Sequence, residues 1–220
     1  MSPNAPEKVK QVLESGFIGE GEQVKLFEKN LKKYIGCKNL ITTNSATSAL
    51  HLTLHLLKNN IHGHKKYNWP FVKEGDEVLS CPLTCTATNW PVLANNLNLK
   101  WVDVDKNTCN MCLVDLKNKL SAKTKIIILV HWGGNPINLE KIEEIKDYSE
   151  KKYGFRPIII EDSAHAFGSE YKGQILSSIE NDNIKVHSFQ AIKHITSIDG
   201  GCIVFPDNNL TKQAKLLRWY

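Results

Sequence analysis

Hydrophobic positions along this chain alternate between short, continuously apolar runs and stretches with helical spacing. The runs at residues 126–130 and 158–160 contain only isoleucine, leucine and valine, which favours strands buried on both faces. Between residues 23 and 34, apolar side chains recur every three or four positions with lysines opposite, and Gly36 follows, which is typical of an amphipathic helix and its end. The same pattern predicts helices at 23–34, 47–57, 86–94, 114–120 and 139–151, and strands at 40–43, 77–81, 99–104, 125–131, 157–161, 185–189 and 202–205.

Strands that alternate with helices in this way predict an α/β fold. We expect a mostly parallel central sheet with helices on both faces. Residues 62–73 are polar and aromatic without a regular period, and we interpret them as an irregular surface insertion. We expect Phe189 and Trp90 to be core residues.

Composition and charge narrow the function classes. Hydrophobic residues make up 41% and charged residues 23% of the 220 residues, as in ordinary globular proteins. The net charge of +5 comes from scattered lysines interleaved with glutamates, and Arg156 and Arg218 are the only arginines, so the sequence does not favour a nucleic-acid partner. The chain has no apolar run long enough to cross a bilayer and no signal-peptide pattern at its start. We therefore expect a cytoplasmic protein without a membrane partner, and free thiols at its six cysteines.

Three short segments at the expected strand ends carry candidate chemistry, because ligands of open parallel sheets bind beyond the carboxyl ends of the strands. Asp162 follows three isoleucines, where a desolvated carboxylate needs a cationic partner, although Asp can equally cap a helix. Lys193 follows an apolar strand, either as an imine-forming lysine or as a solvated loop lysine. Residues 45–47 precede a helix, either as an anion seat or as an ordinary cap.

In combination the three segments are more specific than any one of them alone. A phosphate seat, a buried acid and an imine-forming lysine, in this chain order, are what the cofactor pyridoxal phosphate requires of a protein. The acid would keep the ring nitrogen protonated, so that the ring can accept electrons from a substrate carbanion.

The chain resembles the DegT/StrS family of pyridoxal-phosphate-dependent sugar aminotransferases, which have the aspartate-aminotransferase fold (fold type I), from about residue 17 to its last residue. The segments that carry the resemblance are FIGEGEQVKLFEKNL, NSATSALHLTL, GDEVLSCPLTCTATN, WVDVD, TKIIILVHWGG, IIIEDSAHAFGSEYKG, SFQAIKHITSIDGG and LLRWY. The resemblance implies that Lys193 forms the imine with the cofactor and acts as the catalytic base. It also implies that Asp162 pairs with the pyridine nitrogen and that His165 contacts the ring oxygen.

The resemblance further assigns a phosphate seat and a ring-side segment. It implies that Ser188, Thr47 and the amide of Ala46 bind the phosphate, and that Thr84 passes beside the ring. Many family members carry an aromatic residue that stacks on the ring where this chain has Cys85. Either Cys85 packs on the ring more weakly, or another residue covers it.

The resemblance also implies a domain organisation. Residues 1–22 would form an N-terminal arm, and residues 23–220 a cofactor-binding large domain that is incomplete at its C-terminal end and lacks the small domain. The chain would then be a fragment or one piece of a split protein. We expect the complete protein to be a homodimer whose arm lies along the neighbouring subunit, and the 220 residues alone to be poorly soluble or inactive.

The function that the resemblance implies is transfer of an amino group from glutamate, the expected donor, to a nucleotide-linked keto-sugar. One alternative is a sugar dehydratase of the same family, although those members replace the imine-forming lysine with histidine. Another is a truncated, non-catalytic remnant or structural partner. We expect no metal site, because Cys109 and Cys112 lack a second ligand pair and a turn explains Asp103 and Asp105.

Overall fold

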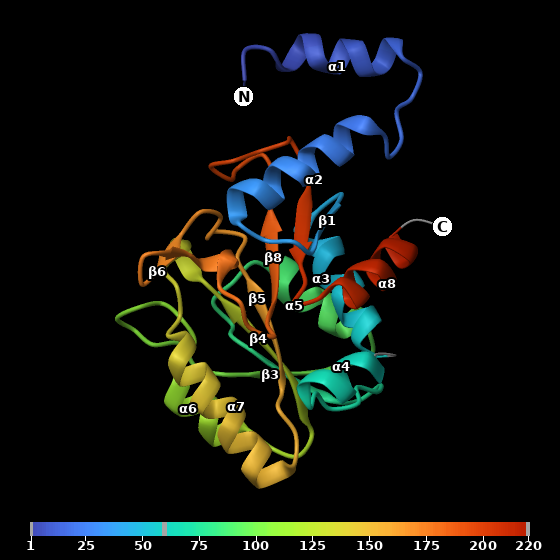
Figure 1. Cartoon of the computed structure of the whole chain (residues 1–220). Coiled ribbons are helices and arrows are strands. Elements are labelled where there is room, and N and C mark those ends of the chain that lie inside the picture. Colours follow the sequence, from blue (N-terminus) through green and yellow to red (C-terminus); the bar gives the residue numbers. More distant parts are fainter. Residues whose placement is uncertain (1, 59–60, 219–220) are drawn as a thin grey trace.

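The computed structural model describes residues 2–58 and 61–218 of the chain (Figure 1). The helices are α1 (Ala5–Glu14), α2 (Glu22–Ile35), α3 (Ala46–Leu57), α4 (Ile61–Tyr67), α5 (Thr86–Ala94), α6 (Leu113–Lys119), α7 (Leu139–Tyr153) and α8 (Asn208–Arg218). The strands are β1 (Leu40–Thr43), β2 (Glu77–Ser80), β3 (Asn98–Trp101), β4 (Thr124–Val130), β5 (Ile158–Asp162), β6 (Glu170–Tyr171), β7 (Gln174–Ile175), β8 (Ile184–Ser188) and β9 (Gly201–Val204). Every helix and strand that the apolar pattern predicts is present, within one to three residues at each end.

The central sheet is mostly parallel, as predicted. Within the described residues it has seven strands in the order β1-β9-β8-β5-β4-β2-β3. Strands β3, β2, β4, β5 and β8 run parallel to one another, whereas β9 is antiparallel to both β8 and β1. The carboxyl ends of β1, β2, β4, β5 and β8 therefore meet at one edge of the sheet, where the candidate residues lie.

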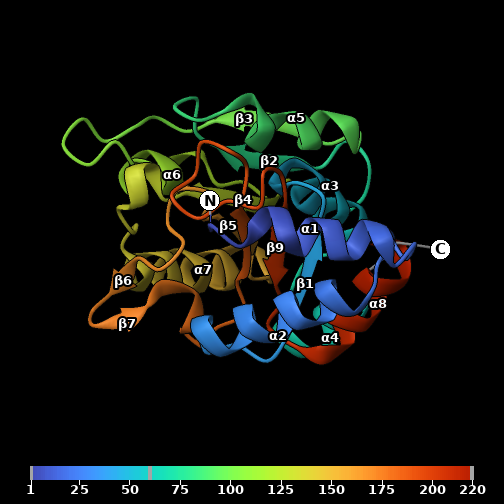
Figure 2. The same cartoon turned by 90° about the horizontal axis from the view of Figure 1, so that it is seen from above.

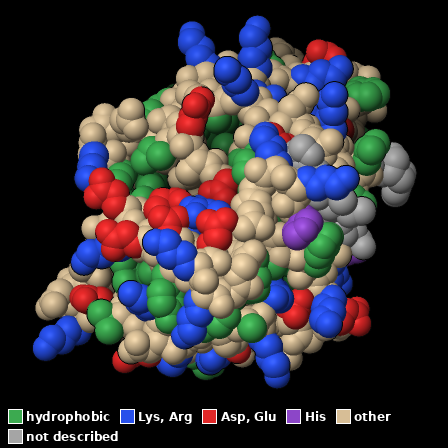
Figure 3. All heavy atoms as spheres, turned by 60° about the horizontal axis from the view of Figure 1, so that its bottom comes forward, with side chains coloured by type: hydrophobic (Ala, Val, Ile, Leu, Met, Phe, Trp, Pro, Cys, Tyr) green, Lys and Arg blue, Asp and Glu red, His purple; other side chains and the backbone are tan. Residues whose placement is uncertain are grey.

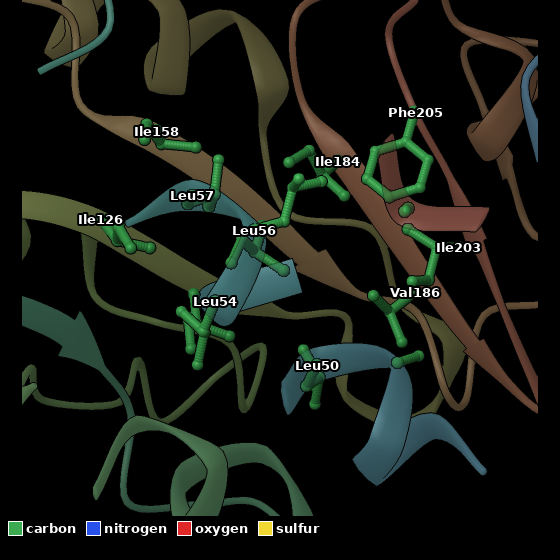
Figure 4. Packing of buried hydrophobic residues seen from close by; sticks show 14 of the residues in the cluster. Leu50, Leu54, Leu56, Leu57, Ile126, Ile158, Ile184, Val186, Ile203 and Phe205 are labelled. Atoms are coloured by element: carbon green, nitrogen blue, oxygen red, sulfur yellow. The ribbon is translucent and has the colours of Figure 1, made fainter. Parts of the chain in front are cut away.

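Helices cover both faces of the sheet, so the alternate side chains of the central strands enter different cores (Figures 1 and 2). On one face, α3, α5 and α8 pack against Ile126, Ile128 and their neighbours, as the close-up of Leu54, Leu56 and Leu57 illustrates (Figure 4). On the other face, α6 and α7 pack against residues such as Ile127 and Leu129. Burial on both faces explains why these strands are continuously apolar.

The predicted surface insertion at residues 62–73 is wrong. Its first part is helix α4, and Trp69 and Val72 are buried, with only 1% and 4% of their surface exposed. The Trp69 ring lies 4.9 Å from the ring of Tyr67, and its indole N–H donates to Asp182 at 3.1 Å. The segment is thus part of the first core, although its polar residues hide this in the sequence.

Other differences concern single residues and elements without a strong period. Phe189 is buried as predicted, but Trp90 is 63% exposed, so its assignment to the core is wrong. The strand predicted at 99–104 ends at Trp101, and Val104 instead forms an isolated bridge with Met111. Helices α1 and α8 and the short β6–β7 hairpin were not predicted.

The surface and the cysteines agree with the sequence analysis. Acidic and basic side chains intermingle over the face shown in Figure 3. Arg156, for example, pairs with Glu143, Asp147 and Glu150. The six cysteines are free thiols, as predicted. No described helix is long and apolar enough to span a membrane. The described residues contain no group of three or more His, Cys, Asp or Glu side chains that could hold a metal ion.

Candidate active site

One pocket of about 470 Å³ at the carboxyl edge of the sheet brings together every candidate site residue. These residues are Ala46, Thr47, Thr84, Cys85, Asp162, His165, Ser188 and Lys193. They come from the ends of β5 and β8, the start of α3, the segment before α5, and the loops after β5 and β8. The structure therefore supports their grouping, while the role of each stays a prediction.

Asp162 ends β5 with only 5% of its surface exposed. Its Oδ1 accepts the backbone N–H of Ala164 at 3.1 Å, and its Oδ2 accepts the hydroxyl of Thr88 at 2.6 Å. The expected cationic partner is not found, because no ion pair joins Asp162 to another described residue, and neutral donors take its place. Since each carboxylate oxygen has two lone pairs, both retain capacity for a donor in the pocket.

The start of α3 is a capped helix terminus, and it was also predicted to be an anion seat. Ser45 is the N-cap, and its hydroxyl accepts the backbone N–H of Ser48 at 3.1 Å, while Ser45 O accepts the N–H of Ala49 at 3.0 Å. The amides of Ala46 and Thr47 precede these bonds, so they and the positive end of the helix dipole remain for a ligand. The cap is therefore confirmed and leaves donors for an anion, while the anion seat itself stays a prediction.

A glycine lets the sheet approach this seat closely. A Cβ on Gly201, the first residue of β9, would lie 2.6 Å from the amide nitrogen of Ala46 and 2.7 Å from Ser45 O. Any larger residue would push the start of α3 away from the sheet. Ser188 lies beside it at the end of β8, and its hydroxyl oxygen accepts the N–H of Gln190 at 3.4 Å, which leaves the hydroxyl hydrogen for the pocket.

His165 and Lys193 face the same pocket from two loops. The Nδ1 atom of His165 accepts the N–H of Gly133 at 3.4 Å, which places the proton of the neutral ring on Nε2. Partial burial and the positive charge of Lys193 lower the pKa of His165, and the negative charge of Asp162 only partly offsets them. His165 is thus a neutral hydrogen-bond donor at physiological pH. Its ring also meets the edge of Trp132, with 5.3 Å between centroids.

Several pocket residues were missed by the sequence analysis. They are Leu50, Ala87, Thr88, Val130, Ala164, Gln190, Ile192 and Asp199. Thr88 is the most informative, because it is 1% exposed and bonded to both Asp162 and Thr84. Its position one helical turn after Thr84 is the sequence signal that would have found it. Cys85 is exposed at the N-cap of α5, and His165 supplies the only aromatic ring among the described residues that line the pocket.

A larger hollow of about 810 Å³ lies on the other side of α3. Residues of the N-terminal segment, β1, α3 and the end of α8 line it, including Ile18, His51 and Leu217. None of the candidate site residues lines this hollow. Its size therefore does not make it the better candidate for the chemistry.

A buried polar network lies behind the site, on the opposite face of β5 from Asp162. His131 Nδ1 accepts the N–H of Ile137 at 3.1 Å, so its Nε2–H donates to Glu161 at 3.0 Å. Burial opposes ionisation of Glu161, but the bond from His131 and the charge of Lys185 outweigh it and lower the pKa of that carboxyl. The Nε2 of His187 contacts the hydroxyl of Ser177 at 2.8 Å.

His187 makes the stability of the fold depend on pH. Complete burial lowers its pKa from 6.5 to about 4, so this histidine takes up a proton at a lower pH in the folded state than in the unfolded state. The contribution of His187 to the free energy of unfolding is therefore fully present above pH 6.5 and is lost as the pH falls from 6.5 to about 4. We expect the free energy of unfolding to drop by about 2 kcal/mol from this residue between pH 7 and pH 5. Urea unfolding at the two pH values measures the drop.

The matched control for this prediction is His187→Gln, which removes the titrating group but keeps a side-chain amide. His165 also has a lowered pKa and titrates with the same sign, but it is present in both proteins and cancels in their difference. The Gln variant should lose about 2 kcal/mol less stability on acidification. An equal loss in both proteins would show that His187 does not cause the effect.

Comparison with protein families gives a match over nearly the whole chain. A model of the DegT/DnrJ/EryC1/StrS aminotransferase family matches residues 2–220. Uncharacterized protein MJ1066 from Methanocaldococcus jannaschii is 33% identical over 212 residues, which are 96% of this chain and 49% of that protein. The chain thus spans about half the length of this relative.

Solved structures give the same result. AtS13 from Actinomadura melliaura is 42% identical, with a TM-score of 0.90, and matches 100% of this chain and 55% of its own. The sugar aminotransferase CalS13 from Micromonospora echinospora is 37% identical, with a TM-score of 0.87, and matches 100% of this chain and 56% of its own. These similarities support the predicted fold and the predicted family.

Dehydratases are also similar to this chain. The E. coli GDP-4-keto-6-deoxy-D-mannose-3-dehydratase, solved with hydrated pyridoxal phosphate, is 25% identical with a TM-score of 0.81 over 96% of this chain and 50% of its own. A structure of GDP-4-keto-6-deoxymannose-3-dehydratase with a trapped PLP-glutamate geminal diamine is 26% identical, with a TM-score of 0.83 over 98% of this chain and 52% of its own. Solved proteins of this shape thus bind the cofactor that the sequence predicts.

Proposed function

Because the chain belongs to the DegT/DnrJ/EryC1/StrS aminotransferase family, we propose that it forms the cofactor-binding part of a pyridoxal-phosphate-dependent sugar aminotransferase. The observation that carries the proposal is the convergence of Lys193, Asp162 and the N-terminus of α3 on one pocket. The proposed substrates are a nucleotide-linked keto-sugar, which becomes an amino-sugar, and glutamate, which donates the amino group.

The residues of the pocket fit this cofactor. The free amides of Ala46 and Thr47 and the hydroxyl of Ser188 are donors suited to a phosphate group. The buried carboxylate of Asp162 suits a protonated ring nitrogen, which would supply the positive charge that the neighbouring side chains do not. The close approach of Gly201 to the backbone of Ala46 fixes the position of the phosphate seat.

Pyridoxal phosphate, when bound, withdraws electrons from the carbon next to the substrate amine. The C–H bond of that carbon then loses its proton more easily. The Nζ atom of Lys193 would hold the cofactor and, when free, would be the base that moves a proton. Asp162 would hold the proton on the ring nitrogen, and His165 Nε2–H would be a donor for the ring oxygen. Because all three groups are fixed in one pocket, proton transfer is effectively intramolecular.

The dehydratase of the same family is the second candidate, since several of the similar solved structures are dehydratases. The resemblance implies a histidine in place of Lys193 in such enzymes, and this chain has the lysine. A non-catalytic remnant is the third candidate. The complete pocket argues against it, because a decayed site is not expected to keep every candidate residue on one surface.

We also propose that residues 1–22 form an arm that packs on a second copy of the protein, and that residues 23–220 form the large domain. Helix α1 has no buried residue, and it lies apart from the sheet above α2 (Figure 1). Phe17 and Ile18 are 66% and 73% exposed, which suits residues that a partner covers. A monomeric full-length protein in light scattering would contradict the proposal. The cytoplasm is the proposed location.

The test of the function uses the full-length protein with pyridoxal phosphate, glutamate and a panel of nucleotide-linked keto-sugars. We expect visible absorption from the bound cofactor, formation of 2-oxoglutarate, and a sugar product whose mass shows that an amine has replaced the ketone oxygen. A product that has lost water without gaining nitrogen would identify a dehydratase. A protein that binds no cofactor would identify a remnant.

A further inference from the structure

Thr88 lies between the segment beside the pocket and the carboxylate of Asp162. It stands in the first turn of α5, and its side chain is enclosed, with 1% of the residue exposed. Its Oγ1 is 2.6 Å from Asp162 Oδ2 and 2.7 Å from the Oγ1 of Thr84. Thr88 and Asp162 are 74 residues apart in the chain, so their bond connects α5 to the end of β5.

The chemistry of the three groups fixes the direction of both hydrogen bonds. A hydroxyl has one hydrogen to donate, and an ionised carboxylate can only accept. Thr88 therefore donates its hydrogen to Asp162 Oδ2, and its contact with Thr84 must be a bond that Thr84 donates. The hydroxyl hydrogen of Thr84 is thus already used, and Thr84 offers only acceptor lone pairs to a molecule in the pocket.

The remaining contact of Asp162 completes its orientation. The N–H of Ala164 donates to Oδ1, on the other side of the carboxylate from Thr88. Two donors, one on each oxygen, hold the carboxylate plane at two points. The free lone pairs of both oxygens are then directed by Thr88 and Ala164 together, although neither of these groups needs to touch the ring nitrogen.

We infer that Thr88 is a positioning residue, whose hydroxyl orients Asp162 toward the ring nitrogen of the cofactor and commits Thr84 to act as a hydrogen-bond acceptor. This inference rests on the proposed function, because it requires a protonated ring nitrogen opposite Asp162. It adds a role for a residue of α5 that holds no cofactor atom itself. A carboxylate that loses one donor holds a shared proton more tightly, so Thr88 also keeps that proton on the ring nitrogen.

The experiment compares Thr88→Val with Thr88→Ser in the full-length protein. Valine has the shape of threonine without the hydroxyl, whereas serine keeps the hydroxyl and loses only a methyl group. Two measurements are made besides activity: the dissociation constant of pyridoxal phosphate, and the ¹⁵N chemical shift of the ring nitrogen in labelled cofactor. Thermal unfolding of the cofactor-free proteins reports on packing alone.

We expect Thr88→Val to weaken cofactor binding by about tenfold or more and to move the ¹⁵N shift toward the unprotonated value. Thr88→Ser should stay within about threefold of the wild type and keep its ¹⁵N shift. If both variants lose thermal stability while the ¹⁵N shift of the valine variant equals that of the wild type, Thr88 has only a structural role and the inference is overturned. A wild-type protein that binds no pyridoxal phosphate would overturn the proposed function itself.

Discussion

Replacing Lys193 with alanine is expected to abolish covalent capture of pyridoxal phosphate and to lower transamination by about 10⁴-fold or more. Lys193 follows the end of β8 and lines the pocket that holds Asp162 and the start of α3. Its amine is the group proposed both to hold the cofactor and to move the proton, so its loss removes two contributions at once. Borohydride reduction of the loaded full-length protein, followed by mass spectrometry of its peptides, measures the capture directly.

The matched control is Lys212→Ala, an exposed lysine on α8 that lies outside the pocket. The control should retain the borohydride-stable adduct on the peptide that contains Lys193, with activity unchanged. The chain has many lysines, and accidental adducts at exposed amines are a known risk of this chemistry. An adduct of equal yield in the Lys193→Ala variant would therefore show that the assignment is wrong.

The sequence predicts the sheet well because its strands are buried on both faces. Residues 126–130 and 158–160 are entirely apolar for that reason, and no competing interpretation fits them. The elements it misses lack this constraint. Helix α1 buries no residue, and the β6–β7 hairpin consists of two residues in each strand, so neither leaves a strong pattern.

The two tryptophan errors have different causes. Trp69 follows a polar segment, and only its contacts with distant residues such as Asp182 place it in the core. The exposure of Trp90, by contrast, follows from the geometry of its own helix. Thr88, Asn89, Pro91 and Val92 are buried, and position 90 lies about 200° around the helix from position 88. Helical geometry therefore turns Trp90 outward, whatever its hydrophobicity.

The candidate site was predictable as far as the strand-end rule and the family resemblance reach. Asp162 and Ser188 lie at the ends of β5 and β8, and Lys193 lies in the loop after β8, as expected. The sequence analysis did not identify Thr88 as a pocket residue because Thr88 lies inside a helix. A threonine at such a position has the same sequence pattern as any small core residue. Only the contact between α5 and β5 shows its bond to Asp162.

Replacing Asp162 with asparagine is expected to leave the fold intact and to lower transamination by about 10³-fold. The asparagine Oδ1 atom can still accept the N–H of Ala164. Its Nδ2 atom would face Thr88, whose hydroxyl can accept that bond and turn its own hydrogen toward Thr84. Every hydrogen bond of the buried side chain is then kept, so thermal unfolding should shift by no more than about 3 °C, the equivalent of roughly 1 kcal/mol.

The loss of activity in Asp162→Asn follows from charge, because a neutral amide cannot hold the proton of the ring nitrogen, and the ring then withdraws electrons poorly. Single-turnover reaction with glutamate separates this chemical step from cofactor binding, since it is measured at saturating pyridoxal phosphate. Asp147→Asn is the matched control, because Asp147 pairs with Arg156 on the surface of α7 and does not line the pocket. The control should react at the wild-type rate. A rate close to wild type in Asp162→Asn would contradict the role of Asp162, and with it the reason for the buried bond from Thr88.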